Sequence, residues 1–117
     1  MVETPAAALA IPAILKHAEF LCVGTNDLTQ YTLAAARDDA AVNEYFQDGH
    51  ESVMRLLRII LAEASGRSVT LCGELAGREA YIPLLLEMGF RALSVAPTII
   101  PTTKTLIRKL DIGAGIG

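Results

Sequence analysis

Two acidic residues could together hold a divalent cation, because each stands at the end of an apolar segment. Glu3 closes the apolar start of the chain, and Asp27 follows the apolar run Phe20–Val23. Magnesium prefers oxygen ligands and commonly takes one or two carboxylates together with phosphate oxygens. The alternative is that both acids only favour the positive amino ends of the helices that follow them. Spacing alone favours this alternative and leaves both interpretations open.

The polar segment Gly24–Gln30 could bind an anion. Its glycine, hydroxyl and amide residues, Asn26 among them, lie where a strand is expected to turn towards a helix and offer backbone N–H groups there. Arg37, ten positions past Asp27, could fold back and hold a phosphate through a fork of hydrogen bonds. The alternatives are an ordinary polar loop and a solvated arginine beside the two aspartates that follow it. On spacing alone these alternatives are the better supported.

A third candidate is Cys72, which follows the apolar run Val69–Leu71 and opens onto a Gly-Glu turn. A thiol with a reference pKa of about 8.5 is mostly protonated at neutral pH and could donate a proton. The alternative is a small buried residue, which is our interpretation of Cys22 inside its own strand. His17 and His50 lack metal-ligand spacing and are expected at the surface.

These candidates lie at the ends of short apolar segments that alternate with helices. Strands are expected at Phe20–Val23, Val69–Leu71 and Ala92–Val95, after a stub at Met1–Glu3. Helices are expected at Ala6–Ala18, about Leu28–Ala36, His50–Ala64, Glu79–Met88 and Pro101–Leu110. The continuous apolar run Phe20–Val23 indicates a strand buried on both faces.

This alternation predicts an α/β fold with parallel strands and right-handed crossovers. An open doubly wound sheet and part of a (β/α)8 barrel both fit the pattern. In either architecture the functional groups gather at the C-terminal ends of the strands. The polar residues expected there are Glu3, Asn26, Asp27, Cys72, Glu74 and Ser94.

Composition excludes several classes of protein. The 117 residues, 52% of them hydrophobic, suffice for one domain with a real core. The net charge of −3, without a basic run, argues against binding nucleic acid or an anionic membrane surface. No apolar run approaches the roughly 20 residues of a membrane span, and no signal peptide is recognisable. Two cysteines form neither a disulfide framework nor a zinc pattern, so we expect a cytoplasmic protein with reduced thiols.

Three linked motifs resemble the signature of phosphoenolpyruvate-utilising enzymes. They are MVETPAA (Met1–Ala7), GTNDLTQYTLA (Gly24–Ala34) followed by Arg37, and CGELAG (Cys72–Gly77). Within this family the motifs most resemble those of Enzyme I of the sugar phosphotransferase system, the phosphoenolpyruvate–protein phosphotransferases. Pyruvate phosphate dikinase and phosphoenolpyruvate synthase are more distant. Ala36 departs from the aspartate usual in Enzyme I, and the Arg-Asp-Asp that follows is closer to the dikinase pattern.

The resemblance implies a fold and a set of roles. Residues 1–110 would be the C-terminal half of a (β/α)8 TIM barrel, and residues 111–117 a flexible glycine-rich tail. A complete barrel needs roughly 250 residues, so the chain is expected to be a fragment. By resemblance, Glu3 and Asp27 would bind Mg²⁺, Asn26 and Arg37 would hold the phosphate of phosphoenolpyruvate, and Cys72 would be the proton donor.

The implied activity is phosphoryl transfer from phosphoenolpyruvate to a histidine on a domain outside this chain, with pyruvate as product. A phosphocarrier protein would be the partner of the full-length enzyme, and the isolated chain is expected to be inactive. Two alternatives are a noncatalytic half-barrel that self-associates, and a fragment of pyruvate phosphate dikinase or phosphoenolpyruvate synthase. An open half-barrel leaves strand edges uncovered, so we expect a homo-oligomer.

Overall fold

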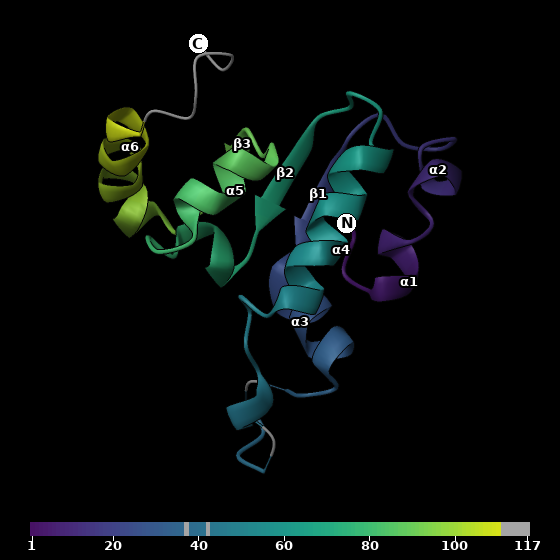
Figure 1. Ribbon diagram of the computed structural model, residues 1–117, viewed down its shortest axis with the longest axis horizontal. Helices are drawn as coiled ribbons and strands as arrows, with labels where there is room; N and C mark the ends of the chain where they lie inside the picture. Colours follow the sequence, from purple (N-terminus) through teal and green to yellow (C-terminus); the bar gives the residue numbers. More distant parts are fainter. Residues whose placement is uncertain (37, 42, 111–117) are drawn as a thin grey trace.

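The fold is built on a small parallel sheet, shown in the computed structural model of Figure 1, which describes residues 1–36, 38–41 and 43–110. Its strands are β1 (Leu21–Gly24), β2 (Val69–Cys72) and β3 (Ala92–Leu93), in the spatial order β1-β2-β3. Val2 adds an isolated parallel bridge to Val23. The Val2 bridge uses the Cys22 carbonyl and the Gly24 N–H, on the edge of β1 away from β2. The strands are parallel, as the alternating pattern predicts, and the extended segments lie side by side in the order of the chain.

Among the residues that the structure describes, the helices cover one face of this sheet. Leu21 and Val23 in β1 and Leu71 in β2 are buried, whereas the alternate residues Cys22 and Cys72 are half-buried. Successive side chains of a strand point to opposite faces, so the helices cover one face and leave the other open. The prediction of a strand buried on both faces is therefore wrong. Phe20 precedes the strand and is 64% exposed.

The helix predicted at Ala6–Ala18 is broken into α1 (Pro5–Ala8) and α2 (Ile11–Ile14). Pro12 explains the break, because proline has no N–H to donate to the Ala8 carbonyl and its ring collides with that carbonyl. It is tolerated where it stands, in the first turn of α2. The amino end of α1 is capped by Thr4, since the Ala7 N–H donates to the Thr4 hydroxyl oxygen at 3.1 Å.

The polar loop predicted at Gly24–Gln30 is helical from Thr25 onwards, so the helix predicted at about Leu28–Ala36 is present but begins three residues earlier. Helix α3 (Thr25–Leu33) begins directly after β1 and ends at Ala34, which takes a left-handed conformation with φ 53°. Leu28 and Thr29 are fully buried, so packing against the core stabilises a helix in a polar stretch. The segment after α3 has one described 3-10 turn, η1 (Asn43–Tyr45), and projects beyond the ends of α3 and α4 in Figure 1.

The remaining helices follow the predicted order with shifted ends. Helix α4 (Glu51–Glu63) confirms the predicted spacing, and the His50 ring accepts a hydrogen bond from the Ser52 N–H at its start. Helix α5 (Ile82–Met88) begins three residues later than predicted, with a proline in its first turn. After β3, the 3-10 turn η3 (Pro97–Ile99) leads into α6 (Ile100–Lys109).

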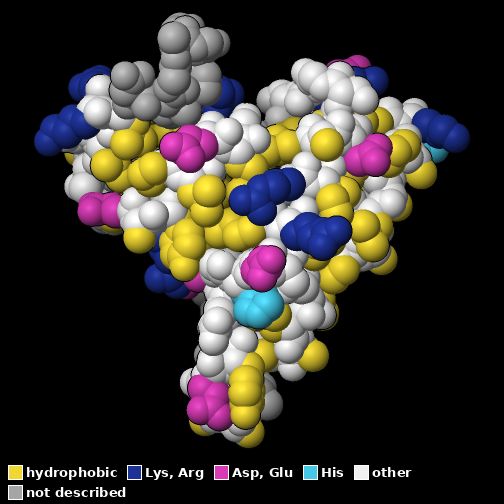
Figure 2. All heavy atoms as spheres, in the orientation of Figure 1, with side chains coloured by type: hydrophobic (Ala, Val, Ile, Leu, Met, Phe, Trp, Pro, Cys, Tyr) yellow, Lys and Arg dark blue, Asp and Glu magenta, His cyan; other side chains and the backbone are white. Residues whose placement is uncertain are grey.

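Two further expectations concern the ends and the surface. Residues 111–117, predicted to form a tail, lie outside the described residues. Among the helices that the structure describes, none has the length and hydropathy needed to traverse a bilayer. The face drawn in Figure 2 carries basic and acidic side chains interspersed among hydrophobic ones.

Replacing the fully buried Leu71 with alanine should destabilise the fold, because its side chain fills the core beneath the central strand. We expect Leu71→Ala to lower the free energy of unfolding by about 2–5 kcal/mol. The matched control is Leu9→Ala, whose leucine is 65% exposed and whose loss should change stability by no more than about 0.5 kcal/mol. Urea denaturation followed by circular dichroism measures both; equal losses would contradict the assigned core.

Candidate functional site

The C-terminal ends of the extended segments place four residues in one row on the open face. Gly24 pairs with Cys72 in the register of β1 and β2. Ser94 follows the Leu71–Leu93 pair, and its N–H donates to the Leu71 carbonyl at 2.8 Å, which sets it beside Cys72. On the other side, Glu3 lies over Gly24, where a Cβ would come within 2.9 Å of its Cγ and 3.0 Å of its Oε1. The row therefore runs Glu3, Gly24, Cys72, Ser94.

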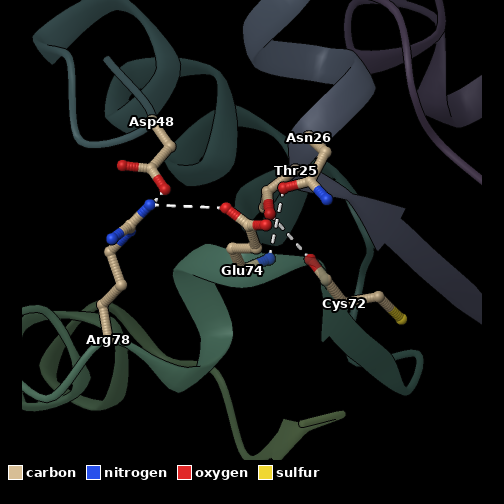
Figure 3. Close-up of polar contacts among 6 residues, drawn as sticks. All are labelled: Thr25, Asn26, Asp48, Cys72, Glu74 and Arg78. Carbon is tan, nitrogen blue, oxygen red and sulfur yellow. Dashed lines mark hydrogen bonds and ion pairs between the residues drawn. The ribbon is translucent and has the colours of Figure 1, made fainter. Parts of the chain in front are cut away.

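The start of α3 holds the turn that follows β2 (Figure 3). The Thr25 hydroxyl donates to the Cys72 carbonyl at 2.7 Å, and the Glu74 N–H donates to the Asn26 side-chain oxygen at 3.2 Å. Gly73 has φ +96°, and a Cβ there would overlap the Thr25 hydroxyl oxygen. A residue without a side chain is therefore required between Cys72 and η2 (Glu74–Gly77).

Asn26 has one side-chain group available for a ligand. Its oxygen already accepts the Glu74 N–H, so its amide nitrogen is the atom that could donate to an anion. Asn26 is half-buried and lines a cavity of about 560 Å³ together with Gly73, Arg78 and Ser94. The cavity lies between the turns that follow β2 and β3, at the Ser94 end of the row.

Cys72 is held as a neutral thiol. Burial raises the pKa of the thiol above its usual value, the nearby Cys22 raises it further, and a hydrogen bond with Ser94 opposes them. A raised pKa keeps the proton on sulfur to higher pH, which suits an acid at neutral pH. The interpretation of Cys22 as a fully buried residue is wrong, because it is half-buried on the same open face as Cys72.

An ion-pair cluster borders the site on the far side of Glu74. The Arg78 Nε donates to the mostly buried Asp48 carboxylate, and another guanidinium nitrogen lies 3.5 Å from Glu74. The hydrogen bond with Asp48 raises the pKa of Arg78, so the guanidinium remains charged. In Figure 3 the Cys72 sulfur points away from this pair. The cluster ties the end of the projecting segment to η2.

The two predicted metal ligands are placed on neighbouring segments. Glu3 is half-buried over Gly24, and Asp27 is exposed in the first turn of α3. Within the described residues, no group of three or more His, Cys, Asp or Glu side chains could hold a metal ion. Two carboxylates still fit Mg²⁺, which usually keeps several waters and takes substrate phosphate oxygens. Asp27 also lies in the first turn of α3, where a negative charge interacts favourably with the amino end of a helix. The helix-capping and metal-binding interpretations of Asp27 therefore both remain open.

One predicted site residue, Arg37, lies outside the described residues. The contacts of Thr25, Ser94, Asp48 and Arg78 were not predicted. Period-two alternation places Ser94 on the face of Cys72 once β2 and β3 are aligned, so strand register is a signal for it. The Asp48–Arg78 pair has no such signal, because its members lie 30 positions apart and in no common motif.

Comparisons with known proteins agree on one family. The family described as PEP-utilising enzyme, PEP-binding domain, matches residues 1–112. The phosphoenolpyruvate-protein phosphotransferase of Streptococcus equinus is 42% identical over 113 residues, 95% of this chain and 20% of that protein. The proteins of the same name from Enterococcus faecalis and Haemophilus influenzae are 41% and 40% identical, with the same coverage. The chain thus spans about a fifth of the length of these relatives.

The turn after β2 should not tolerate a side chain at Gly73. We expect Gly73→Ala to lower the free energy of unfolding by about 1–3 kcal/mol or more, from a positive φ and overlap with Thr25. Gly66→Ala is the matched control, because Gly66 also has a positive φ, 79°, but no atom within 4 Å of a Cβ. Gly66→Ala should cost only the backbone strain, about 1 kcal/mol. Equal losses in urea denaturation would remove the role assigned to the Thr25 contact.

Proposed function

The chain belongs to the family of PEP-utilising enzymes, as a PEP-binding domain, and from that premise we propose that it forms the phosphoenolpyruvate- and magnesium-binding part of a phosphoenolpyruvate–protein phosphotransferase. The observation that carries the proposal is the row of Glu3, Gly24, Cys72 and Ser94 across neighbouring strand ends. Separate motifs of the sequence meet in this row and in the start of α3. Functional groups of parallel α/β folds gather at this end of the strands.

We propose that the sheet is a sector of a (β/α)8 barrel. Its strands follow the order of the chain without reversal. A doubly wound sheet reverses that order at a switch point and carries helices on both faces. One covered face and one open face support the barrel, in which the helices form an outer ring. The open face would then look into the barrel interior.

The proposed ligand contacts follow from this placement. Glu3 and Asp27 would hold Mg²⁺, and Asn26 and Arg37 would hold the phosphate of phosphoenolpyruvate. Magnesium, when bound, would neutralise charge on the transferring phosphoryl group. Asn26 would donate from its amide nitrogen, because its oxygen is held by the Glu74 N–H. That same hydrogen bond fixes the orientation of the amide before the ligand arrives.

Cys72 would protonate the enolate that remains after the phosphoryl group has left. Its raised pKa supports this role, because only the neutral thiol can give a proton to carbon. The phosphoryl group would pass to a histidine outside this chain and then to a phosphocarrier protein, with pyruvate as product. The reported relatives carry the phosphotransferase name, which favours this activity over that of a dikinase or a synthase.

The proposal is tested in a chimera in which this chain replaces the matching fifth of the Streptococcus equinus phosphotransferase. Pyruvate release is measured with phosphoenolpyruvate, phosphocarrier protein and varied Mg²⁺. Glu3→Gln should raise the Mg²⁺ concentration needed for half-maximal rate by on the order of tenfold or more, since a charged ligand is lost. Glu63→Gln, at the exposed end of α4, is the matched control and should change nothing.

Two results of this experiment count against the proposal. One is an unchanged Mg²⁺ dependence in the Glu3→Gln chimera. The other is release of pyruvate above background by the 117-residue chain alone, because the proposed acceptor histidine belongs to another part of the enzyme.

A noncatalytic, self-associating half-barrel is the second candidate, and the open face of the sheet favours it. Within the described structure, no further strand pairs with Val2 or with the outer edge of β3. Met1 and Phe20 are large apolar residues with 74% and 64% of their surface exposed. Unpaired strand edges and exposed apolar surface invite association.

Self-association makes its own prediction for the 117-residue chain. Light scattering should give the mass of a dimer or a larger oligomer at high protein concentration, because association would cover the open face. Phe20→Glu should shift the chain towards monomer, whereas Glu19→Gln, next to it and also exposed, should not. A stable monomer at high concentration would contradict this candidate.

A further inference from the structure

Ser94 is set beside Cys72 by the backbone of the sheet. It is the first residue after β3, and its N–H donates to the Leu71 carbonyl at 2.8 Å. Since Leu71 pairs with Leu93, the next residues along both strands, Cys72 and Ser94, are neighbours and point to the same face. The position of the Ser94 side chain therefore follows from strand register.

Two hydroxyl groups hold Cys72 in different ways. The Thr25 hydroxyl donates to the Cys72 carbonyl at 2.7 Å and holds the backbone of the turn. The Ser94 hydroxyl instead forms a hydrogen bond with the Cys72 thiol. This bond lowers the pKa of the thiol, so it is of the kind that stabilises the thiolate, with the hydroxyl donating to sulfur.

Ser94 also connects the thiol to solvent. Its side chain is exposed and lines the cavity that contains Asn26 and Gly73. Cys72 is only half-buried, but its sulfur points away from the polar turn occupied by Thr25 and Glu74 (Figure 3). A hydroxyl that touches both sulfur and water can pass a proton between them.

We propose that Ser94 is a positioning residue for Cys72 that aims the thiol and returns its proton after each turnover. This deepens, and rests on, the proposed role of Cys72 as proton donor. In the donation step the S–H bond breaks, a C–H bond forms at the enolate carbon, and the electron pair of the S–H bond stays on sulfur. The thiolate then takes the Ser94 hydroxyl proton while the Ser94 oxygen takes a proton from a water molecule, and the hydroxide that remains passes to the solvent.

Other groups near Cys72 do not offer this path. Cys22 on β1 is itself a thiol and raises the pKa of Cys72. Glu3 lies beyond Gly24, and Glu74 lies in η2 on the side of Arg78. An experiment on the pH dependence of Cys72 should therefore keep Glu3 and Glu74 and change only the residue at position 94.

The chain offers a direct measurement of this contact. Its two cysteines are Cys22 and Cys72, so a Cys22→Ala chain has Cys72 as its single thiol. Alkylation by iodoacetamide is followed across pH by mass spectrometry. In the Cys22→Ala chain, the alkylation rate rises with pH as the Cys72 thiol ionises. At pH values below the midpoint of this rise, Ser94→Ala should slow alkylation by about threefold to tenfold, the change expected from losing one ordinary hydrogen bond to the thiolate.

Ser94→Thr keeps the hydroxyl and is the matched control, with a profile close to that of the unchanged chain. Circular dichroism confirms that each variant is folded. A Ser94→Ala profile that superimposes on the parent overturns the inference, and so does a Ser94→Thr profile that shifts as far as that of alanine.

Turnover separates this inference from the proposed function. In the chimera, Ser94→Ala should lower kcat for pyruvate release with little change in KM and increase the solvent deuterium effect, and Ser94→Thr should restore kcat. A change in KM alone overturns the proton-return role. Full activity of Cys72→Ala refutes the proton-donor role of Cys72 and the return path with it, while the alkylation profiles still decide whether Ser94 orients the thiol.

Discussion

The site depends on one close approach, between the first turn of α3 and the turn that follows β2. The Thr25 hydroxyl donates to the Cys72 carbonyl there, and the Asn26 side chain accepts the Glu74 N–H. Gly73 makes the approach possible, because a Cβ would occupy the space of the Thr25 hydroxyl. Two motifs separated by more than forty positions are joined at this point, with sequence separations of 47 and 48 in the two hydrogen bonds. The face that the Cys72 side chain takes follows from alternation along β2, and this close approach holds the turn that comes directly after it.

The two faces of the sheet differ, and this difference leaves the cysteine side chains accessible. Helices bury Val23 and Leu71 on one face, and the same strands present Cys22 and Cys72 on the other. Alternation along a strand thus separates the residues that stabilise the fold from those that could meet a ligand. A substitution on the buried face would therefore act on stability, and one on the open face would act on the proposed chemistry, although both lie on the same short strands.

Opposed influences act on the Cys72 thiol. Burial and Cys22 favour the neutral form, and the Ser94 hydrogen bond favours the thiolate. A proton donor needs both kinds of influence, because the neutral thiol must be stable before the reaction and the thiolate must be stabilised after it. The arrangement around Cys72 is therefore consistent with repeated donation and recovery of a proton, in an enzyme of which this chain would form the phosphoenolpyruvate-binding part.

The sequence by itself determined the order of strands and helices along the chain, the span of α4 to within a residue at each end, and the polar residues that lie at or next to the strand ends, although the strands themselves end one or two residues from the predicted positions. These features depend on local periodicity and on motifs that can be read along the chain. Tertiary structure alone decided the single covered face, the helical start of α3, and the contacts of Thr25, Ser94 and Arg78 with distant partners. Pro12 was a local signal for the break between α1 and α2 that the helical composition of its neighbours obscured. The other contacts could not be predicted, because a hydrogen bond between distant residues depends on strand register and packing, which no short stretch of sequence contains.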